Sequence, residues 1–234
     1  EKYGVRIVED AAHAFGSYYN GKKIGSFGDI TCFSFDSIKV ITCGEGGAIV
    51  CRDETFADLL REKRLLGMDR KSHTNQWKKR RWFFDVKTQG YRYHMSNINA
   101  AIGIEQLKKI DNFIQRRREI CKRYQKGLRG IPQLQLLKVD YNSIVPFMFV
   151  VRVKDGLRNK LMEFLKEKDI ETGINYIPNH LHLIYRTNHL KLPETKAAFK
   201  EILTLPLHCR LSDEDVSYII RGVQEFFFKK GVEA

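Results

Sequence analysis

The sequence lacks long apolar runs. A membrane-spanning helix needs about 20 consecutive apolar residues, and no segment of the 234 residues approaches that length. The opening residues, EKYGVRIVED, show no signal-peptide pattern, and internal repeats and low-complexity segments are also missing. We therefore expect a cytoplasmic protein that has no membrane partner.

Cysteine is sparse and is not arranged in pairs. The five cysteines are irregularly spaced and contain no CxxC motif (Cys32, Cys43, Cys51, Cys121 and Cys209). No group of histidines and cysteines has the spacing of a zinc site. This pattern favours free thiols in a reducing compartment over a disulfide framework, and no metal is expected.

Positive charge, in contrast, is abundant. The chain carries 41 Lys and Arg against 28 Asp and Glu, a net charge of +13, and a basic segment with aromatic residues spans 61–84. Such a segment could bind nucleic acid through phosphate contacts and base stacking. Because no known nucleic-acid module accompanies it, a solvated basic surface or an electrostatic funnel for a small phosphorylated ligand is the better interpretation.

Several short segments have the pattern of β-strands. VRIVED (5–10) is typical of a parallel strand that is buried on both faces. The segment 18–29 contains an Asn-Gly turn and three glycines, which predict a loop or hairpin. Further strands are predicted at 30–35, 47–52 and 144–153.

Helical patterns alternate with these strands. One begins after the N-cap Asp53 and ends at Gly67. A longer one, which could be bent, runs over 96–128 with Ser96 as its N-cap. Two more are predicted at 157–170 and at 212–230, where SDED forms a capping box. The alternation predicts an α/β fold in two parts, 1–112 and 113–234, and with 43% hydrophobic residues each part can bury a core.

Four residues near the first strands could carry chemistry. Asp10 stands at the end of a predicted strand, where α/β sheets place ligand-binding groups, although it could simply cap a helix. His13 follows it closely and could equally be a histidine of the core. Ser34 and Lys39 lie five residues apart after a strand, so that a hydroxyl could hold a phosphate and a partly desolvated lysine could form a Schiff base. Taken alone, Lys39 could also be an ordinary surface lysine.

Six stretches, in order along nearly the whole chain, resemble the DegT/DnrJ-type sugar aminotransferases. They are VEDAAHAFG (8–16), GSFGDITCFSFDSIK (25–39), GEGGAIV (44–50), GYRYHMSNINAAIGIEQL (90–107), NYIPNH (175–180) and LPLHCRLSDEDV (205–216). This family uses pyridoxal 5'-phosphate (PLP) and has the type I aminotransferase fold. The resemblance thus implies an incomplete large-domain sheet followed by a smaller C-terminal α/β domain.

The resemblance also implies a role for each of the four residues. Asp10 would pair with the pyridine nitrogen and keep it protonated, so that the ring acts as an electron sink. His13 would contact the phenolic oxygen of the cofactor, and Ser34 would bind its phosphate. Lys39 would form the Schiff base and then move the proton between substrate and cofactor.

Three further residues are implied by the same resemblance. GYRYHM matches a segment that reaches into the active site of the partner in a homodimer, where many members have GYNYRM. Arg92 replaces the asparagine there and could meet a phosphate through its charge. In NYIPNH, His180 matches a histidine near the sugar nucleotide and Tyr176 is also expected to contact substrate, whereas Asn175 replaces a common histidine.

The function implied is PLP-dependent transfer of an amino group from an amino acid, glutamate, to a keto group of a nucleotide-activated sugar. Such sugars serve the biosynthesis of surface polysaccharides or related compounds. Lys39 favours transamination over the sugar deoxygenation of members that have histidine at this position. A non-catalytic member with a structural or regulatory role remains an alternative, and nucleic-acid binding is a weaker one.

The start of the chain suggests a further expectation. It has no initial methionine and its first residues read as a helix end that runs into a strand. Members of the family are longer and carry, before this point, a turn that holds the phosphate and an aromatic residue that stacks on the ring. We therefore expect residues 1–112 to be the C-terminal part of the large cofactor-binding domain and 113–234 to be the small domain.

Overall fold

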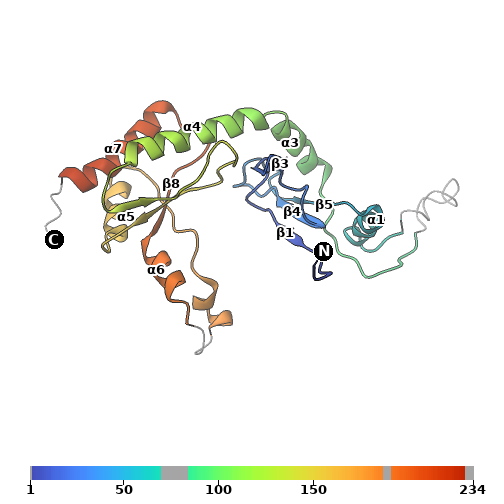
Figure 1. Cartoon of the computed structure of the whole chain (residues 1–234). Helices are drawn as coiled ribbons and strands as arrows, with labels where there is room; N and C mark the ends of the chain where they lie inside the picture. The colour runs from blue at the N-terminus through green and yellow to red at the C-terminus, as the bar shows by residue number, and fades with distance from the viewer. Residues whose placement is uncertain (1, 70–83, 187–190, 230–234) are drawn as a thin grey trace. The chain divides into compact units, whose positions relative to one another are not determined.

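The computed structural model describes residues 2–69, 84–186 and 191–229. Most of the basic segment 61–84 therefore lies outside the described residues. The chain divides into two compact units, Glu1–Asp111 (unit 1) and Asn112–Ala234 (unit 2). Figure 1 shows their helices and strands, and each unit is described by itself.

Unit 1 contains a three-stranded mixed sheet. Its strands are β1 (Val8–Asp10), β4 (Ile30–Ser34) and β5 (Gly47–Cys51), in the order β1-β4-β5. β1 and β4 run parallel, with Asp10 opposite Cys32, and β5 is antiparallel to β4. Since β1 and β4 are parallel neighbours, their carboxyl ends lie at the same edge of the sheet.

The prediction that VRIVED is buried on both faces is wrong. Val5, Ile7 and Val8 are 68%, 58% and 63% exposed. In the part of the chain that the structure describes, β1 is hydrogen-bonded to β4 alone and forms the edge of the sheet. The β-branched pattern thus indicated the strand correctly, but burial depends on neighbours that the pattern does not contain.

The hairpin prediction is confirmed. β2 (Tyr18–Tyr19) pairs antiparallel with β3 (Lys22–Lys23). The two residues between them, Asn20 and Gly21, have φ angles of 46° and 74°, as a type I′ turn requires.

The helices of unit 1 follow the predicted caps more closely than the predicted ends. In α1 (Glu54–Lys63), Asp53 Oδ1 accepts a hydrogen bond from Phe56 N at 3.1 Å, but the helix ends before Gly67. The long stretch 96–128 forms two helices, α3 (Asn97–Leu107) and α4 (Ile110–Leu128), separated at residues 108–109. Ser96 caps α3 as predicted.

Unit 2 packs helices against an antiparallel sheet, β6-β7-β8 (Figure 1). The strands are β6 (Leu134–Leu136), β7 (Phe149–Val153) and β8 (Ile202–Leu205). The remaining elements are α5 (Arg158–Lys166), the 3₁₀ turns η1 (Asn179–Leu181) and η2 (Leu183–Tyr185), α6 (Pro193–Glu201) and α7 (Asp213–Lys229). The capping box of α7 is confirmed, because Ser212 and Asp215 exchange hydrogen bonds of 2.8 and 3.0 Å.

The core of unit 2 forms where α4, α5 and α7 meet the sheet. Its fully buried side chains include Tyr124, Phe149, Leu161, Leu165, Leu203 and Val216. One cation is buried beside them: Arg117 of α4 is 5% exposed, and its Nη1 donates to the carbonyl oxygens of Pro146, Phe147 and Leu207 at 3.2, 3.2 and 3.4 Å. This guanidinium joins α4 to two chain segments that have no regular structure.

The α/β class predicted from the alternating patterns is confirmed. The five cysteines are free thiols, and two of them, Cys43 and Cys121, are buried. Among the described residues, no helix has both the length and the apolar character needed to cross a membrane.

Candidate active site

The structure brings Asp10 and Ser34 to the same edge of the sheet. Each is the last residue of its strand, β1 and β4, and these strands are parallel neighbours. Asp10 Oδ1 accepts a hydrogen bond of 3.1 Å from Ala12 N, which orients the carboxylate. Asp10 is exposed and Ser34 is half-buried, so both side chains are accessible at the carboxyl edge, where α/β sheets bind ligands.

His13 lies close enough to Asp10 and Lys39 for both charges to shift the pKa of its imidazole. The chain turns tightly after β1, with Ala14 N donating to Ala11 O at 2.9 Å, and this turn carries the imidazole. Burial, and then the positive charge of Lys39, lower the pKa of His13 from its ordinary value of 6.5, whereas Asp10 acts to raise it. The imidazole is therefore neutral at pH 7 and above.

Lys39 stands in the middle of a closed loop that follows β4. We call residues 35–46 the lysine loop. Lys39 N donates to Asp36 O at 3.0 Å, and Ile38 N donates to Asp36 Oδ1 at 3.0 Å, so the loop has a defined turn before the lysine. Phe15 packs edge-on against Phe33 and Phe35, at 5.2 Å between ring centroids in both cases. These rings join the turn that carries His13 to the strand that leads into the loop.

The proximity of the ionisable side chains of Asp10, His13 and Lys39 leads to a prediction. We expect the His13 imidazole to titrate below pH 6.5, because protonation would place a second positive charge beside Lys39. Replacing Lys39 by methionine should raise the pKa of His13, and Asp10→Asn should lower it further. Proton NMR of the imidazole over pH 4–9 measures both shifts. An unchanged titration in Lys39→Met would show that the two side chains are not neighbours.

Arg92 lies on another segment of unit 1 and is exposed. It forms an antiparallel bridge with Leu65, and a second bridge joins Met68 to Val86. These two segments of the chain approach each other closely. A Cβ atom at Gly90 would lie 2.0 Å from Gly67 N, so glycine is required at position 90. The predicted phosphate contact of Arg92 in a partner subunit stays a prediction.

Tyr176 and His180 belong to unit 2 and not to the unit that contains Lys39. Tyr176 is 55% exposed. His180 lies in η1, and its Nε2 atom is buried without a hydrogen-bond partner within the described ranges. Because this nitrogen is buried, it is not accessible to a ligand in this conformation, and the substrate contact expected of His180 stays a prediction.

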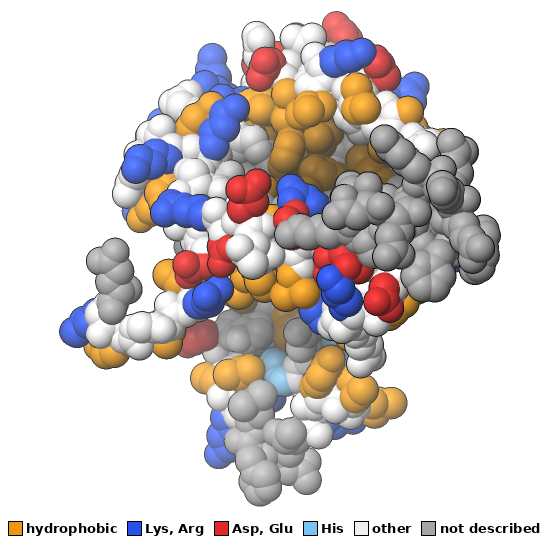
Figure 2. All heavy atoms as spheres, turned by 90° about the vertical axis from the view of Figure 1, so that its right-hand side faces the viewer, with side chains coloured by type: hydrophobic (Ala, Val, Ile, Leu, Met, Phe, Trp, Pro, Cys, Tyr) orange, Lys and Arg blue, Asp and Glu red, His pale blue; other side chains and the backbone are white. Residues whose placement is uncertain are grey.

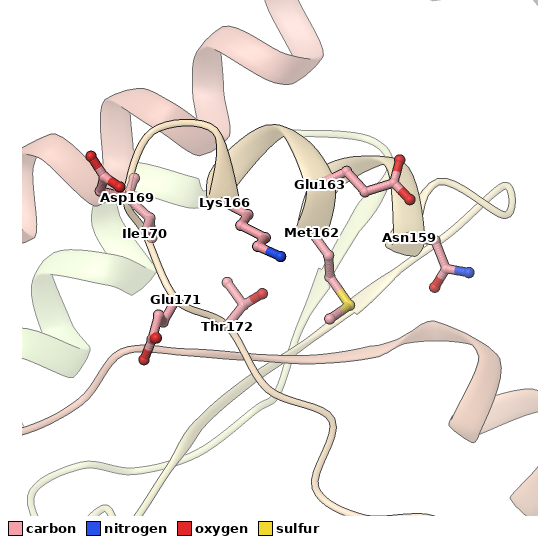
Figure 3. A pocket seen from close by; sticks show the side chains of 8 residues that line it. All are labelled: Asn159, Met162, Glu163, Lys166, Asp169, Ile170, Glu171 and Thr172. Atoms are coloured by element: carbon pink, nitrogen blue, oxygen red, sulfur yellow. The ribbon is translucent and has the colours of Figure 1, made fainter.

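Two hollows in the described structure are not lined by Lys39. One, of about 940 Å³, lies in unit 1 between α1, β5 and residues 91–99, and Figure 2 shows hydrophobic side chains gathered in a hollow on the face that carries α1. The other, of about 870 Å³, lies in unit 2 beside α5, where Lys166 and Thr172 face each other across it (Figure 3). Neither hollow is lined by a predicted site residue. Among the residues described, no group of three or more His, Cys, Asp or Glu side chains could hold a metal ion.

Sequence reasoning missed one residue that contacts the lysine loop directly. Asn99 of α3 donates to the carbonyl oxygens of Cys43 and Glu45, at 2.8 and 3.2 Å. The one signal in the sequence is an asparagine inside a helix, where this residue is unfavourable.

The chain is similar in sequence and structure to known aminotransferases. The family model described as the DegT/DnrJ/EryC1/StrS aminotransferase family matches residues 1–224. Among solved structures, the aminotransferase TlmJ from Streptoalloteichus hindustanus is 33% identical, with a TM-score of 0.83, and the match covers 95% of this chain and 58% of that one.

Two further structures are similar. Spr1654 from Streptococcus pneumoniae, described as a sugar aminotransferase and solved in a PMP form, is 30% identical with a TM-score of 0.86, covering 96% of this chain and 59% of its own. PseC from Helicobacter pylori, an aminotransferase involved in pseudoaminic acid biosynthesis, is 26% identical with a TM-score of 0.86, covering 97% and 60%. The present chain thus spans 58–60% of the length of these three proteins.

Proposed function

Because this chain belongs to the DegT/DnrJ/EryC1/StrS aminotransferase family, we propose that it carries the reactive lysine of a PLP-dependent sugar aminotransferase. Its α/β fold is that of the type I aminotransferases, as its solved relatives show. The observation that carries the proposal is the electrostatic grouping of Lys39, His13 and Asp10 at the carboxyl edge of β1 and β4. PLP enzymes use a lysine that forms a Schiff base and a carboxylate that pairs with the pyridine nitrogen, and Lys39 and Asp10 supply these groups.

The residues of unit 1 fit this cofactor. The carboxylate of Asp10 suits the protonated pyridine nitrogen, the hydroxyl of Ser34 suits the phosphate, and the amine of Lys39 suits the aldehyde. His13 has its pKa lowered, so it can contact the phenolic oxygen without adding a positive charge. PLP, when bound, withdraws electrons from the carbon that bears the amino group and so permits loss of a proton there.

Residues of this protein would hold the cofactor and move the proton. Lys39 Nζ would hold the cofactor and, once the amino donor is bound, would be the base that moves the proton at the substrate carbon. The carboxyl group of Asp10 would pair with the ring nitrogen. The lysine loop positions Lys39 Nζ through its own backbone hydrogen bonds.

The substrates proposed are an amino acid, glutamate, as the donor and a nucleotide-activated keto sugar as the acceptor. The acceptor would contact Tyr176 and His180 of unit 2, and the exposure of Tyr176 supports its part in this role. The aminated sugar would serve polysaccharide or related biosynthesis. We further propose a cytoplasmic homodimer in which Arg92 reaches a phosphate in the active site of the partner.

The donor half of the reaction tests the proposal. PLP added to the purified chain should give a visible absorbance band, and L-glutamate should convert this band to the ultraviolet absorbance of the pyridoxamine form. A nucleotide-activated keto sugar should then restore the visible band, whereas the same sugar without the nucleotide should not. A chain that binds no PLP at any pH would support the non-catalytic alternative instead.

A further inference from the structure

The lysine loop is closed at its base by backbone hydrogen bonds. Phe35 N donates to Gly46 O at 2.8 Å, and Cys43 N donates to Phe35 O at 2.9 Å. Thr42 Oγ1 accepts from Gly44 N at 2.8 Å and donates to Phe35 O at 3.3 Å. The two ends of the loop are thereby fixed to each other, and its orientation depends on what holds its second half, residues 40–46.

A single side chain of α3 holds that half. Asn99 Nδ2 donates to the carbonyl oxygens of Cys43 and Glu45, at 2.8 and 3.2 Å. Asn99 Oδ1 accepts from Ser96 Oγ at 2.5 Å, which sets the orientation of the amide. Both amide hydrogens of Asn99 are therefore used on the loop, while its oxygen is held by the N-cap residue of the same helix.

The packing around Asn99 leaves the loop little room to move on this side. A Cβ atom at Gly103 would lie 2.5 Å from Cys43 Sγ, and a Cβ atom at Gly46 would lie 2.6 Å from the terminal methyl carbon of Met95. Cys43 is only 4% exposed. The second half of the lysine loop thus sits directly against the first turns of α3.

We infer that Asn99 is a positioning residue for Lys39. By binding two carbonyl oxygens of the lysine loop, it holds the loop against α3 and keeps Lys39 Nζ beside Asp10 and His13. This inference rests on the proposed function, in which Lys39 is the reactive amine. It adds a residue 60 positions away in the sequence that acts on the lysine through the loop backbone and does not itself contact substrate.

A charge-matched pair of substitutions tests the inference. Asn99→Asp keeps the shape of the side chain but replaces the donating amide by a carboxylate oxygen that faces two carbonyl oxygens. Asn97→Asp adds the same charge on the same helix, two residues earlier, at an exposed position. Both acids lie in the first turn of α3, where negative charge favours the helix, so loss of the helix would not explain a difference between them.

Two measurements on the purified variants report on the loop. The first is hydrogen exchange of the amides of residues 39–45 without PLP, which should become at least about 10-fold faster in Asn99→Asp. The second is the rate at which PLP and borohydride label Lys39 covalently, which should fall about 10-fold. Asn97→Asp should match the wild type in both, and Asn99→Gln, which keeps the two donors, should recover part of the loss.

Equal exchange and equal labelling in Asn99→Asp and Asn97→Asp would overturn the inference. A wild-type chain in which Lys39 is not labelled would instead contradict the proposed function. In that case the exchange rates alone would decide whether Asn99 holds the loop, because they are measured without the cofactor.

Discussion

Lys39→Ala is expected to abolish the visible absorbance of bound PLP and to lower the rate of amino transfer about 10³-fold or more. The substitution removes both the amine that holds the cofactor and the base that moves the proton at the substrate carbon. The turn at Asp36 holds the backbone of Lys39 in the loop that follows the carboxyl end of β4. Absorbance titration with PLP and a coupled assay for the keto acid formed from glutamate measure the two losses.

Two controls separate the roles of Lys39. Lys39→Arg keeps the positive charge beside His13, but a guanidinium is always protonated and cannot act as a nucleophile. It should therefore lose amino transfer as Lys39→Ala does, yet leave the lowered pKa of His13 in place. Lys108→Ala removes an exposed lysine after α3 and should be silent. A Lys39→Ala protein that keeps more than a tenth of the activity would refute the assignment of this lysine.

The second large effect is expected in the core of unit 2. Arg117→Met should lower the free energy of unfolding by about 2 kcal/mol, because the carbonyl oxygens of Pro146, Phe147 and Leu207 would lose this donor, and a buried acceptor whose donor is removed costs about 1–3 kcal/mol. The substitution also removes the desolvation penalty of the buried guanidinium, and this gain offsets part of the cost. Methionine has a similar length and a good helix propensity, so α4 itself should be retained. Urea unfolding followed by circular dichroism measures the change.

The neighbouring arginine provides the control. Arg118 is half-buried, and its Nε donates to Ile144 O at 2.9 Å. Arg118→Met should therefore cost about 1 kcal/mol or less. If both variants unfold at the same urea concentration, the buried guanidinium of Arg117 does not stabilise the two irregular segments as described.

Local patterns were sufficient to predict where most elements begin. Asp53, Ser96 and Ser212 each cap a helix as expected, since a cap depends on the side chain and on amides three residues away. The short elements β6, β8 and α6 were not predicted. β6 and β8 have three and four residues, which is too few for a periodic pattern, and each pairs with β7, a separate segment of the chain.

Helix ends and burial were harder to predict, because contacts distant in sequence decide them. α1 ends at Lys63, since the following residues turn to pair with the segment around Tyr91, where Leu66 N donates to Tyr91 O at 3.0 Å. The periodicity of 96–128 continues across the break between α3 and α4 and so conceals it. In β1, exposure depends on which strands lie beside it.

The candidate site was predicted only in part from the residues themselves. Strand ends indicated Asp10 and placed Ser34 and Lys39 just after a strand, but their joint role came from a resemblance across six motifs. The contacts of Asn99 could not be predicted, because they are made to backbone carbonyl groups more than 50 positions away. Backbone acceptors leave no trace in the sequence, since every residue type carries one.

The pairing of residues 63–69 with residues 85–93 has a consequence for evolution and engineering. Tyr91 N and Tyr93 N donate to the carbonyl oxygens of Lys63 and Arg64, and Asp69 N donates to Asp85 O at 2.9 Å. The described residues on either side of 70–83 are thus hydrogen-bonded to each other. The entropic cost of joining two such fixed points grows only with the logarithm of the number of residues between them, so a change in the number of residues between Asp69 and Asp85 should leave Arg92 in place. A fluorescent or affinity tag placed there should be tolerated.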